Sequence, residues 1–184
     1  MNVKPLLLGL SGSRGSGKTT LSEHLVESYG YSKISFSEPV RDIVEIIDSS
    51  KKNDREILAK IGIKLRSLKP RLLIEIVREK ISKGEGFIVV EDVRFPEEVV
   101  FLKSIGATLI RLNISKETQL KRLMDRDGGK DNEIHGLTKL MDEMDEKRLD
   151  DFDEWDLEIS GEGDVEKTAN ILHTIIESRE LSVG

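Results

Sequence analysis

The chain of 184 residues is 37% hydrophobic and 35% charged, which is typical of one globular domain with a heavily charged surface. Its net charge of -6 argues against a general binder of nucleic acids or of membrane surfaces, because such proteins need a basic surface. The absence of cysteine excludes disulfides, thiolate metal sites and cysteine nucleophiles.

The first predicted element is a strand over residues 6–10. This apolar run is continuous and ends at a glycine-rich turn, a pattern that favours a buried strand of a parallel sheet. The run is too short for the core of a signal peptide, and no stretch reaches the length of a membrane span. We therefore expect a cytoplasmic protein.

The segment SGSRGSGKTT, residues 11–20, matches the phosphate-loop pattern G-x-x-x-x-G-K-[ST] and leads into a predicted helix that stops at Gly30. Glycines let successive backbone N–H groups converge on phosphate oxygens, and the positive end of the helix faces the same anion. Lys18 would reach the outer phosphates and Thr19 would hold Mg²⁺. A flexible linker is the alternative, but a linker needs neither the lysine nor the flanking strand. The predicted ATP-binding residues are Gly12, Ser13, Arg14, Gly15, Ser16, Gly17, Lys18, Thr19 and Thr20.

After a short strand at 33–36, the chain is predicted to be helical over 40–47, 55–61 and 71–81. A simple crossover between parallel strands needs about a dozen residues. The segment 37–86 is far longer, so we expect an inserted helical subdomain that covers one side of the sheet.

Strands and helices alternate through the rest of the chain, which predicts one α/β domain over residues 1–184. The expected architecture is a three-layer α/β/α P-loop NTPase fold with a five-stranded, mostly parallel sheet. Ligands of such sheets bind beyond the carboxyl ends of the strands, so the glycine loop, residues 36–41 and residues 92–95 should converge. The remaining strands are predicted at 87–91, 108–112 and 157–159, and the remaining helices at 96–105, 115–126, 137–149 and 164–176.

Asp92 follows the predicted strand FIVVE, where a second carboxylate would orient Mg²⁺ together with Thr19. A helix-capping role is the alternative, because the next helix begins only four residues later. Val93 occupies the position at which hydrolytic ATPases of this loop class usually carry glutamate. No N-K-x-D stretch is present, which weakens a GTPase interpretation.

The arginines favour a kinase, which needs cations around the acceptor phosphate and on a lid that closes over the donor. Arg41, Arg66 and Arg94 lie near strand ends or in the inserted helices, whereas Arg122 and Arg126 precede the glycine-rich break DRDGGKDN. Each of them could instead be a solvated surface arginine. Their distribution along the chain is what indicates phosphoryl transfer between two ligands.

Over nearly its whole length the chain resembles the P-loop nucleoside monophosphate kinases, and among them the phage-type deoxynucleoside monophosphate kinases. The segments that carry the resemblance are LSGSRGSGKTTLSEHL, FSEPVRDIV, EILAKIGIKLR and VVEDVRFPEEVVFLKSIGATLIRL. The resemblance implies that the acceptor site is formed by Arg41, Arg66, Asp92, Arg94 and Phe95.

The same resemblance implies a short lid over residues 126–137, with Arg126 at its start and Arg122 just before it. It also implies that the loop 161–163 passes beside the adenine of ATP. The stretch HGLT departs from the family's pattern, so the role of His135 stays open between a structural residue and a ligand contact.

We therefore predict a kinase that transfers the γ-phosphoryl group of ATP, as MgATP, to a nucleoside or deoxynucleoside monophosphate. Lys18, Arg94, Arg122 and Arg126 would act on the migrating group. Two alternatives stay open. One is a dephospho-CoA kinase or other small-molecule P-loop kinase, in which Glu38, Asp42 or Asp92 could activate a hydroxyl. The other is a non-catalytic ATP-binding switch. The expected partner is a small-molecule nucleotide, not nucleic acid or membrane, and the chain would be a monomer or a homodimer.

Overall fold

The computed structural model describes residues 5–127, 149 and 151–181, and within them five strands form one sheet in the order β2-β3-β1-β4-β5. Every neighbouring pair is parallel, where we predicted a mostly parallel sheet. The predicted α/β class is confirmed. The strands are β1 (Leu6–Gly12), β2 (Ser32–Ser35), β3 (Phe87–Glu91), β4 (Thr108–Asn113) and β5 (Leu157–Ser160).

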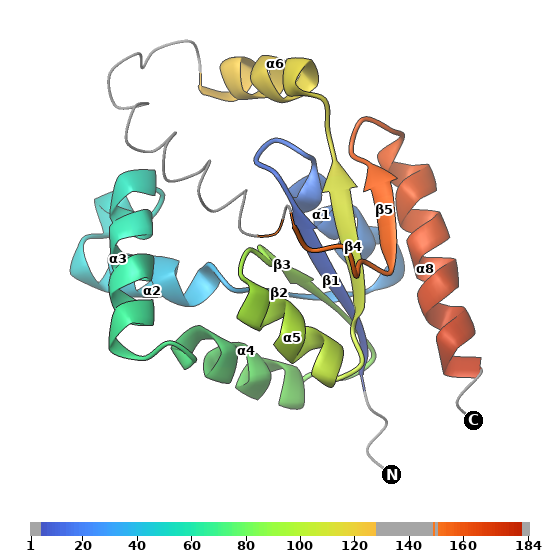
Figure 1. Ribbon diagram of the computed structural model, residues 1–184, viewed down its shortest axis with the longest axis horizontal. Helices are drawn as coiled ribbons and strands as arrows, with labels where there is room; N and C mark the ends of the chain where they lie inside the picture. Colours follow the sequence, from blue (N-terminus) through green and yellow to red (C-terminus); the bar gives the residue numbers. More distant parts are fainter. Residues whose placement is uncertain (1–4, 128–148, 150, 182–184) are drawn as a thin grey trace.

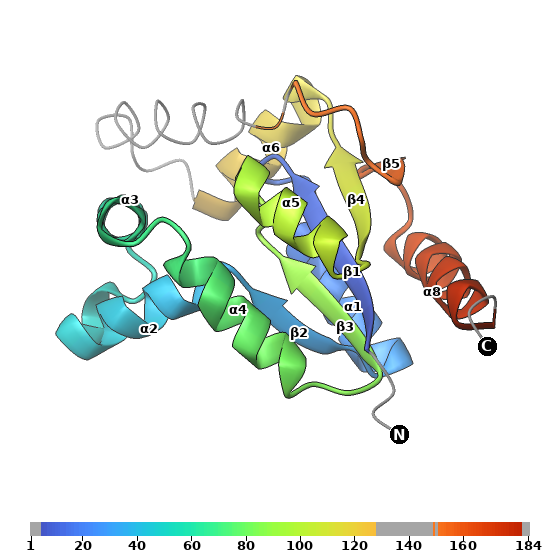
Figure 2. The same cartoon turned by 60° about the horizontal axis from the view of Figure 1, so that its bottom comes forward.

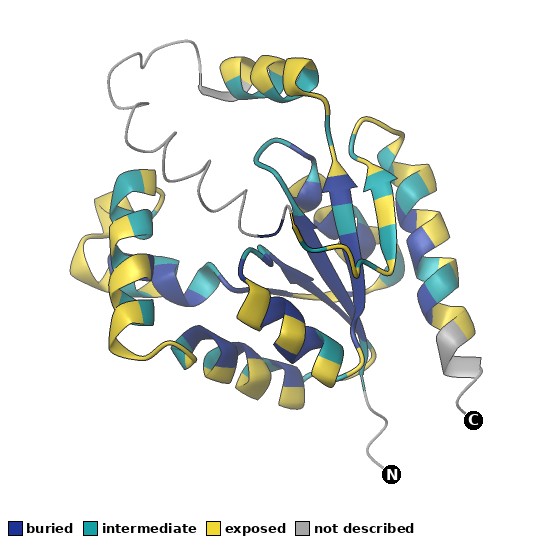
Figure 3. Cartoon of the chain, in the orientation of Figure 1, coloured by how far each residue is buried: buried dark blue, intermediate teal, exposed yellow. Residues whose placement is uncertain are grey.

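Helices cover both faces of the sheet, which gives the predicted three layers (Figure 1, Figure 2). Successive residues of a strand face opposite sides. Leu7 of β1 therefore joins the core beneath α4 (Leu72–Ser82) and α5 (Pro96–Ser104). Leu8 joins the core beneath α1 (Lys18–Tyr29) and α8 (Val165–Leu181). Figure 3 shows that β1 and β3 are largely buried between these helices, whereas β5 at the edge of the sheet is not.

The helices that follow β2 extend beyond the sheet before the chain returns to it (Figure 1). They are α2 (Glu38–Ile47), a short 3₁₀ turn η1 (Ser49–Lys51) and α3 (Arg55–Leu68). Helix α4 then packs on the sheet like an ordinary covering helix, through Leu73, Ile74 and Val77. The boundaries 37–86 of a separate subdomain stay a prediction.

Helix α3 is longer than the sequence indicated. We predicted an end at Ile61, but the helix continues through Gly62 to Leu68. A glycine inside a helix costs about 1 kcal/mol relative to alanine. Gly62 is buried against α2, where a Cβ would lie 4.0 Å from both Val40 methyl carbons, so tertiary packing offsets this cost.

Helix α6 (Lys116–Asp127) follows β4 at the carboxyl edge of the sheet. His135, residues 128–137 of the predicted lid and all but Leu149 of the predicted helix 137–149 lie outside the described residues. In the part of the chain that is described, no helix has the length and apolar character needed to cross a membrane.

Candidate active site

A cavity of about 1160 Å³ opens at the carboxyl ends of β1, β2 and β3. Its walls come from the glycine loop, α2, α3, the turn after β3, α6 and the loop after β5. The three segments that we expected to converge do so. The predicted site residues along its walls are Arg14, Gly15, Ser16, Gly17, Lys18, Thr19, Thr20, Arg41, Arg66, Asp92, Arg94, Phe95 and Arg122.

The glycine loop curls because three of its residues adopt backbone angles that favour glycine. Gly12, Gly15 and Gly17 have φ values of 143°, 79° and 95°, and Gly17 is the N-cap of α1. The ammonium of Lys18 donates to the carbonyls of Gly12 and Ser13 at 2.6 and 2.9 Å. The loop thus presents a buried cation and the positive end of a helix together, which is an arrangement suited to phosphate.

Residues outside the loop fix its outer side. Gln119 donates its Nε2 to the carbonyl of Arg14 at 2.9 Å, and Arg122 donates to the carbonyl of Gly15 at 3.0 Å. Helix α6 therefore supports the glycine loop directly. No sequence signal pointed to Gln119, because a polar residue on an exposed helix is common.

Arg122 and Arg126 were both expected near the lid. Arg122 lines the cavity, but its described hydrogen bond is to the glycine loop. Arg126 lies in the last turn of α6, and its side chain is outside what the structure describes. The transfer roles of both arginines stay predictions.

The loop after β5 lies against the glycine loop. A Cβ on Gly161 would lie 2.0 Å from the carbonyl oxygen of Ser16, so only glycine fits at this contact. The amide of Gly161 donates to the carbonyl of Asn113 at 2.7 Å. Gly161 and Gly163 line the cavity on the side of the glycine loop, which is where the resemblance puts the adenine.

Asp92 adopts the left-handed backbone conformation, with a φ of 57° that is rare for a residue with a side chain. Its carboxylate accepts hydrogen bonds from Ser37 at 2.6 Å, Ser35 at 3.1 Å and Arg94 at 3.1 Å. Burial acts to raise the pKa of Asp92, but the charges of Arg94 and Lys18 outweigh it and hold this pKa well below its usual range. The side chain is thus a fixed anion within reach of two cations.

The alternative of a helix-capping role for Asp92 does not hold. Helix α5 begins at Pro96 with Phe95 as its N-cap, and the side chain that accepts from the backbone there is Glu98. The strained turn at Asp92 instead directs its carboxylate toward the serines that follow β2.

A second carboxylate, Glu91, was missed because it ends a strand in which the sequence pattern indicated only burial. It is 7% exposed, accepts a hydrogen bond from Ser22 of α1 and lies 3.8 Å from the ammonium of Lys33. Burial raises the pKa of Glu91. Glu91 thus faces α1 and Lys33, whereas Asp92 faces the turn before α2, and both carboxylates line the cavity.

The oxygen donors along the cavity suit a magnesium ion that is held mainly by phosphates and water. Magnesium prefers one or two carboxylates with substrate phosphates. Thr19 and Asp92 both line the cavity, and the described residues contain no cluster of three or more acidic, histidine or cysteine ligands. These side chains therefore fit a nucleotide-bound metal.

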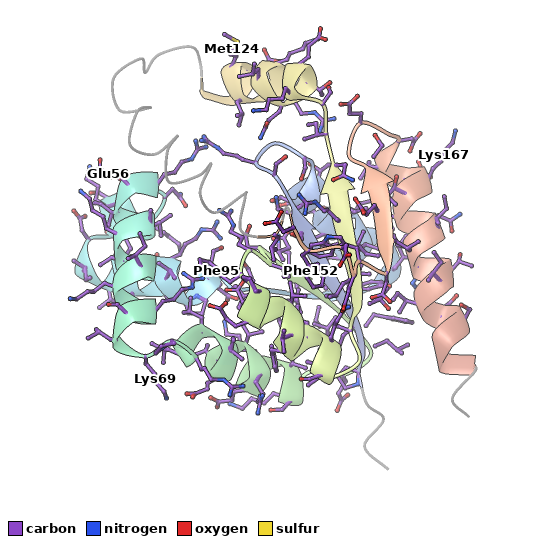
Figure 4. All side chains as sticks on the ribbon, viewed as in Figure 1. Glu56, Lys69, Phe95, Met124, Phe152 and Lys167 are labelled. Carbon is purple, nitrogen blue, oxygen red and sulfur yellow. The ribbon has the colours of Figure 1, made fainter. Side chains whose placement is uncertain are left out.

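The wall opposite the glycine loop carries an aromatic ring and four arginines, which are Arg41, Arg55, Arg66 and Arg94. The guanidinium carbon of Arg66 lies 3.8 Å from the ring centroid of Phe95, and Figure 4 shows Phe95 between α3 and the sheet. Arg94 pairs with Asp92 at 3.1 Å. Among the described residues, no carboxylate pairs with Arg41. This wall can therefore receive an anion, in a protein that is acidic as a whole.

Comparisons with known proteins agree with this geometry. A family model described as "AAA domain" matches residues 11–140. A protein of Acanthamoeba polyphaga mimivirus named "Putative deoxynucleotide monophosphate kinase" is 25% identical, over 59% of this chain and 74% of its own length.

Solved structures share the fold at low identity. A gluconokinase from Sinorhizobium meliloti 1021 has a TM-score of 0.63 at 15% identity, with 100% of both chains covered. A shikimate kinase from Acinetobacter baumannii, in complex with shikimate, has a TM-score of 0.56 at 17% identity, with 96% of each chain covered. At these identities the likeness establishes the fold.

Proposed function

This chain belongs to the AAA domain family. We propose that it is a kinase that transfers the γ-phosphoryl group of ATP to the phosphate of a nucleoside or deoxynucleoside monophosphate. That it is a P-loop phosphotransferase follows from the family and the fold. The nature of the acceptor is our proposal.

One observation carries the proposal: a single cavity joins a phosphate-binding loop to a separate cationic wall. Pockets for one small ligand usually measure about 300 to 1,000 Å³. A cavity of about 1160 Å³, with Lys18 on one side and Arg41, Arg66 and Arg94 on the other, leaves room for two anionic ligands. A hydrolase would need only the first of these sides.

On the donor side, the backbone of the glycine loop and the N-terminus of α1 would hold the phosphates of ATP. The ammonium of Lys18 would exchange its carbonyl partners, Gly12 and Ser13, for the β- and γ-phosphate oxygens. Thr19 and Asp92 would hold magnesium, which when bound neutralises charge between the two outer phosphates.

On the acceptor side, Arg41, Arg66 and Arg94 would bind the monophosphate so that one of its oxygens faces the γ-phosphorus. That oxygen forms the new P–O bond, while the bond from the γ-phosphorus to the β,γ-bridging oxygen breaks and ADP leaves. The migrating group carries its negative charge on the equatorial oxygens, which nearby guanidinium groups stabilise.

A phosphate acceptor also suits the surroundings of Asp92. A hydroxyl acceptor needs a base to remove its proton, whereas a monophosphate is already ionised near neutral pH. Despite burial, the charges of Arg94 and Lys18 hold the pKa of Asp92 well below its usual range, which makes its carboxylate a weak base but keeps it ionised as a possible metal ligand. The name of the mimivirus relative further supports a deoxynucleotide monophosphate as the acceptor.

The test is a coupled assay of ADP release from MgATP with a panel of acceptors. The panel contains AMP, dAMP, dGMP, dTMP, CMP and UMP, and it also contains dephospho-CoA, gluconate and shikimate as hydroxyl acceptors. We expect turnover with at least one nucleoside monophosphate and none with the hydroxyl acceptors.

Two results would contradict the proposal. Turnover of a hydroxyl acceptor alone would identify a kinase of the other class. Calorimetric binding of ATP without product from any acceptor would favour the non-catalytic switch.

A further inference from the structure

Glu98 lies in the first turn of α5 and is 2% exposed. It does not line the cavity, but its carboxylate contacts three groups that belong to the cavity wall. Oxygen Oε2 accepts from the backbone amides of Arg94 and Phe95 at 2.9 and 3.1 Å. Oxygen Oε1 accepts from the guanidinium of Arg66 at 3.0 Å.

Helix capping explains only part of this arrangement. A glutamate at the third helical position commonly accepts from the amide of the N-cap residue, as Glu98 does from Phe95. Such a cap needs no burial and no cation. Burying a carboxylate costs several kcal/mol unless it is paired and fully hydrogen-bonded, and here the pairing cation comes from α3, 32 residues away.

The position of Arg66 shows what the ion pair achieves. Its guanidinium lies over the ring of Phe95, with 3.8 Å from the guanidinium carbon to the ring centroid, and it also lines the cavity. Gly62, one turn earlier on α3, leaves room for it, because a Cβ there would approach Nη1 to 3.3 Å. Glu98 and Phe95 thus fix two sides of the guanidinium, and a third side faces the cavity.

We propose that Glu98 is a positioning residue that locks Arg66 and the Arg94–Phe95 turn into one platform for the acceptor phosphate. The carboxylate of Glu98 thereby fixes the distance between helix α3 and the turn that follows β3. Binding of the acceptor then depends on a buried carboxyl group that does not touch it. This inference rests on the proposed function, and it adds the residue that holds the acceptor side together.

The variant Glu98→Gln separates the two roles of the carboxylate. The glutamine oxygen can still accept from the amides of Arg94 and Phe95, while its NH₂ group meets the guanidinium of Arg66 donor to donor. Since a hydrogen bond to a charged group contributes about 1.5 to 3 kcal/mol, we expect KM for the monophosphate to rise about 10- to 100-fold. KM for ATP should stay within about twofold.

The matched control is Glu97→Gln, which removes an exposed carboxylate from the same helical turn and should change neither KM.

The double variant of Glu98→Gln with Arg66→Ala should bind the acceptor no more weakly than Arg66→Ala alone, because both changes remove the same interaction between Glu98 and Arg66. If Glu98→Gln does not fold, Glu98→Asp provides the same test. It keeps the charge but draws it back from Arg66 by one methylene.

An unchanged KM for the acceptor in a folded Glu98→Gln protein would overturn the inference, and so would equal rises for acceptor and ATP. Failure of the proposed function looks different. In that case the unsubstituted protein turns over no monophosphate at all.

Discussion

Glu91 and Asp92 are adjacent carboxylates with pKa values shifted in opposite directions. Glu91 lies at the end of β3 and faces Ser22 of α1, where burial raises its pKa. The left-handed backbone conformation of Asp92 turns its own carboxylate toward Arg94 and two serines. Nearby cations lower the pKa of Asp92 there. The sequence predicted Asp92 from its place after a strand, but it could not assign charges to neighbours that only folding brings close.

Lys18 is the residue on which the donor site depends most. Replacement by alanine removes the cation that would stabilise the outer phosphates, so we expect kcat to fall by about 10² to 10³-fold. The control is Lys167→Ala, on the solvent-exposed side of α8 (Figure 4), which should leave kcat unchanged. Full activity in a coupled assay of Lys18→Ala would contradict the assignment of the glycine loop as the donor site.

Glu98 predicts a pH dependence of stability. Burial raises its pKa from 4.5 to about 7, although the amide of Arg94 and the charge of Arg66 oppose the shift. Between these values the folded protein retains a proton that the unfolded chain has released. The free energy of unfolding contributed by this group therefore falls as the pH rises from about 4.5 to about 7.

Urea unfolding at several pH values measures this contribution. Glu98→Gln cannot titrate and should lack this part of the slope, whereas Glu97→Gln should keep it. Identical slopes for Glu98→Gln and the unsubstituted protein would rule the contribution out.

At the scale of elements, most helix starts and strand positions were predictable because they depend on neighbours in the sequence. Helix α8, however, continues to Leu181, beyond its predicted end at Ile176. Strand β3 has the predicted bounds, and α1 stops before Gly30, which has a φ of 70°. The end of α3 was predicted wrongly because Gly62 is stabilised by contacts with α2. The hydrogen bonds from α6 to the glycine loop could not be predicted from the sequence either, since they join residues more than 100 positions apart.

The contact between the loop after β5 and the glycine loop gives a prediction at this scale. In Gly161→Ala the new Cβ would lie 2.0 Å from a backbone oxygen, so one of the two loops must move. We expect the free energy of unfolding to fall by about 1 to 3 kcal/mol, as for other overpacked sites, and the affinity for ATP to fall with it.

The control for stability is Gly163→Ala, whose Cβ would meet its nearest atom at 3.6 Å, an ordinary contact; because Gly163 also lines the cavity, the two variants are compared in urea unfolding only. Calorimetric titration with ATP compares Gly161→Ala with the unsubstituted protein. Equal stability of the two variants would show that the contact does not constrain the two loops.

At the scale of the whole molecule, the strand order sets the place of the cavity. The crossover after β1 leads toward β2 on one side, and the crossover after β3 leads to β4 on the other. The carboxyl end of β1 therefore lies at the point where the sheet changes direction, where ligands of such sheets bind. Cations gather there although the net charge of the chain is -6.

If ATP and the acceptor bind at separate places in the cavity, their contributions to the stability of the fold should add. A nonhydrolysable ATP analogue at 100 times its dissociation constant should stabilise the fold by about 2.7 kcal/mol, which raises Tm by roughly 5 to 11 °C in a chain of this size. A monophosphate acceptor should add a second increment. Lys18→Ala should lose the first increment and keep the second, whereas competition between the two ligands in a thermal-shift titration would indicate one shared side.

The sequence by itself determined the α/β class, the glycine loop and the order of the elements, because periodicity and the glycine-lysine spacing are local properties of the chain. Only the tertiary structure decided that Glu98 joins Arg66 to the turn after β3, that α6 supports the glycine loop, and that Glu91 is a buried carboxylate beside α1. These contacts join residues 32 or more positions apart. Their geometry depends on how the helices pack on the sheet, and burial and charge at each site follow from that packing.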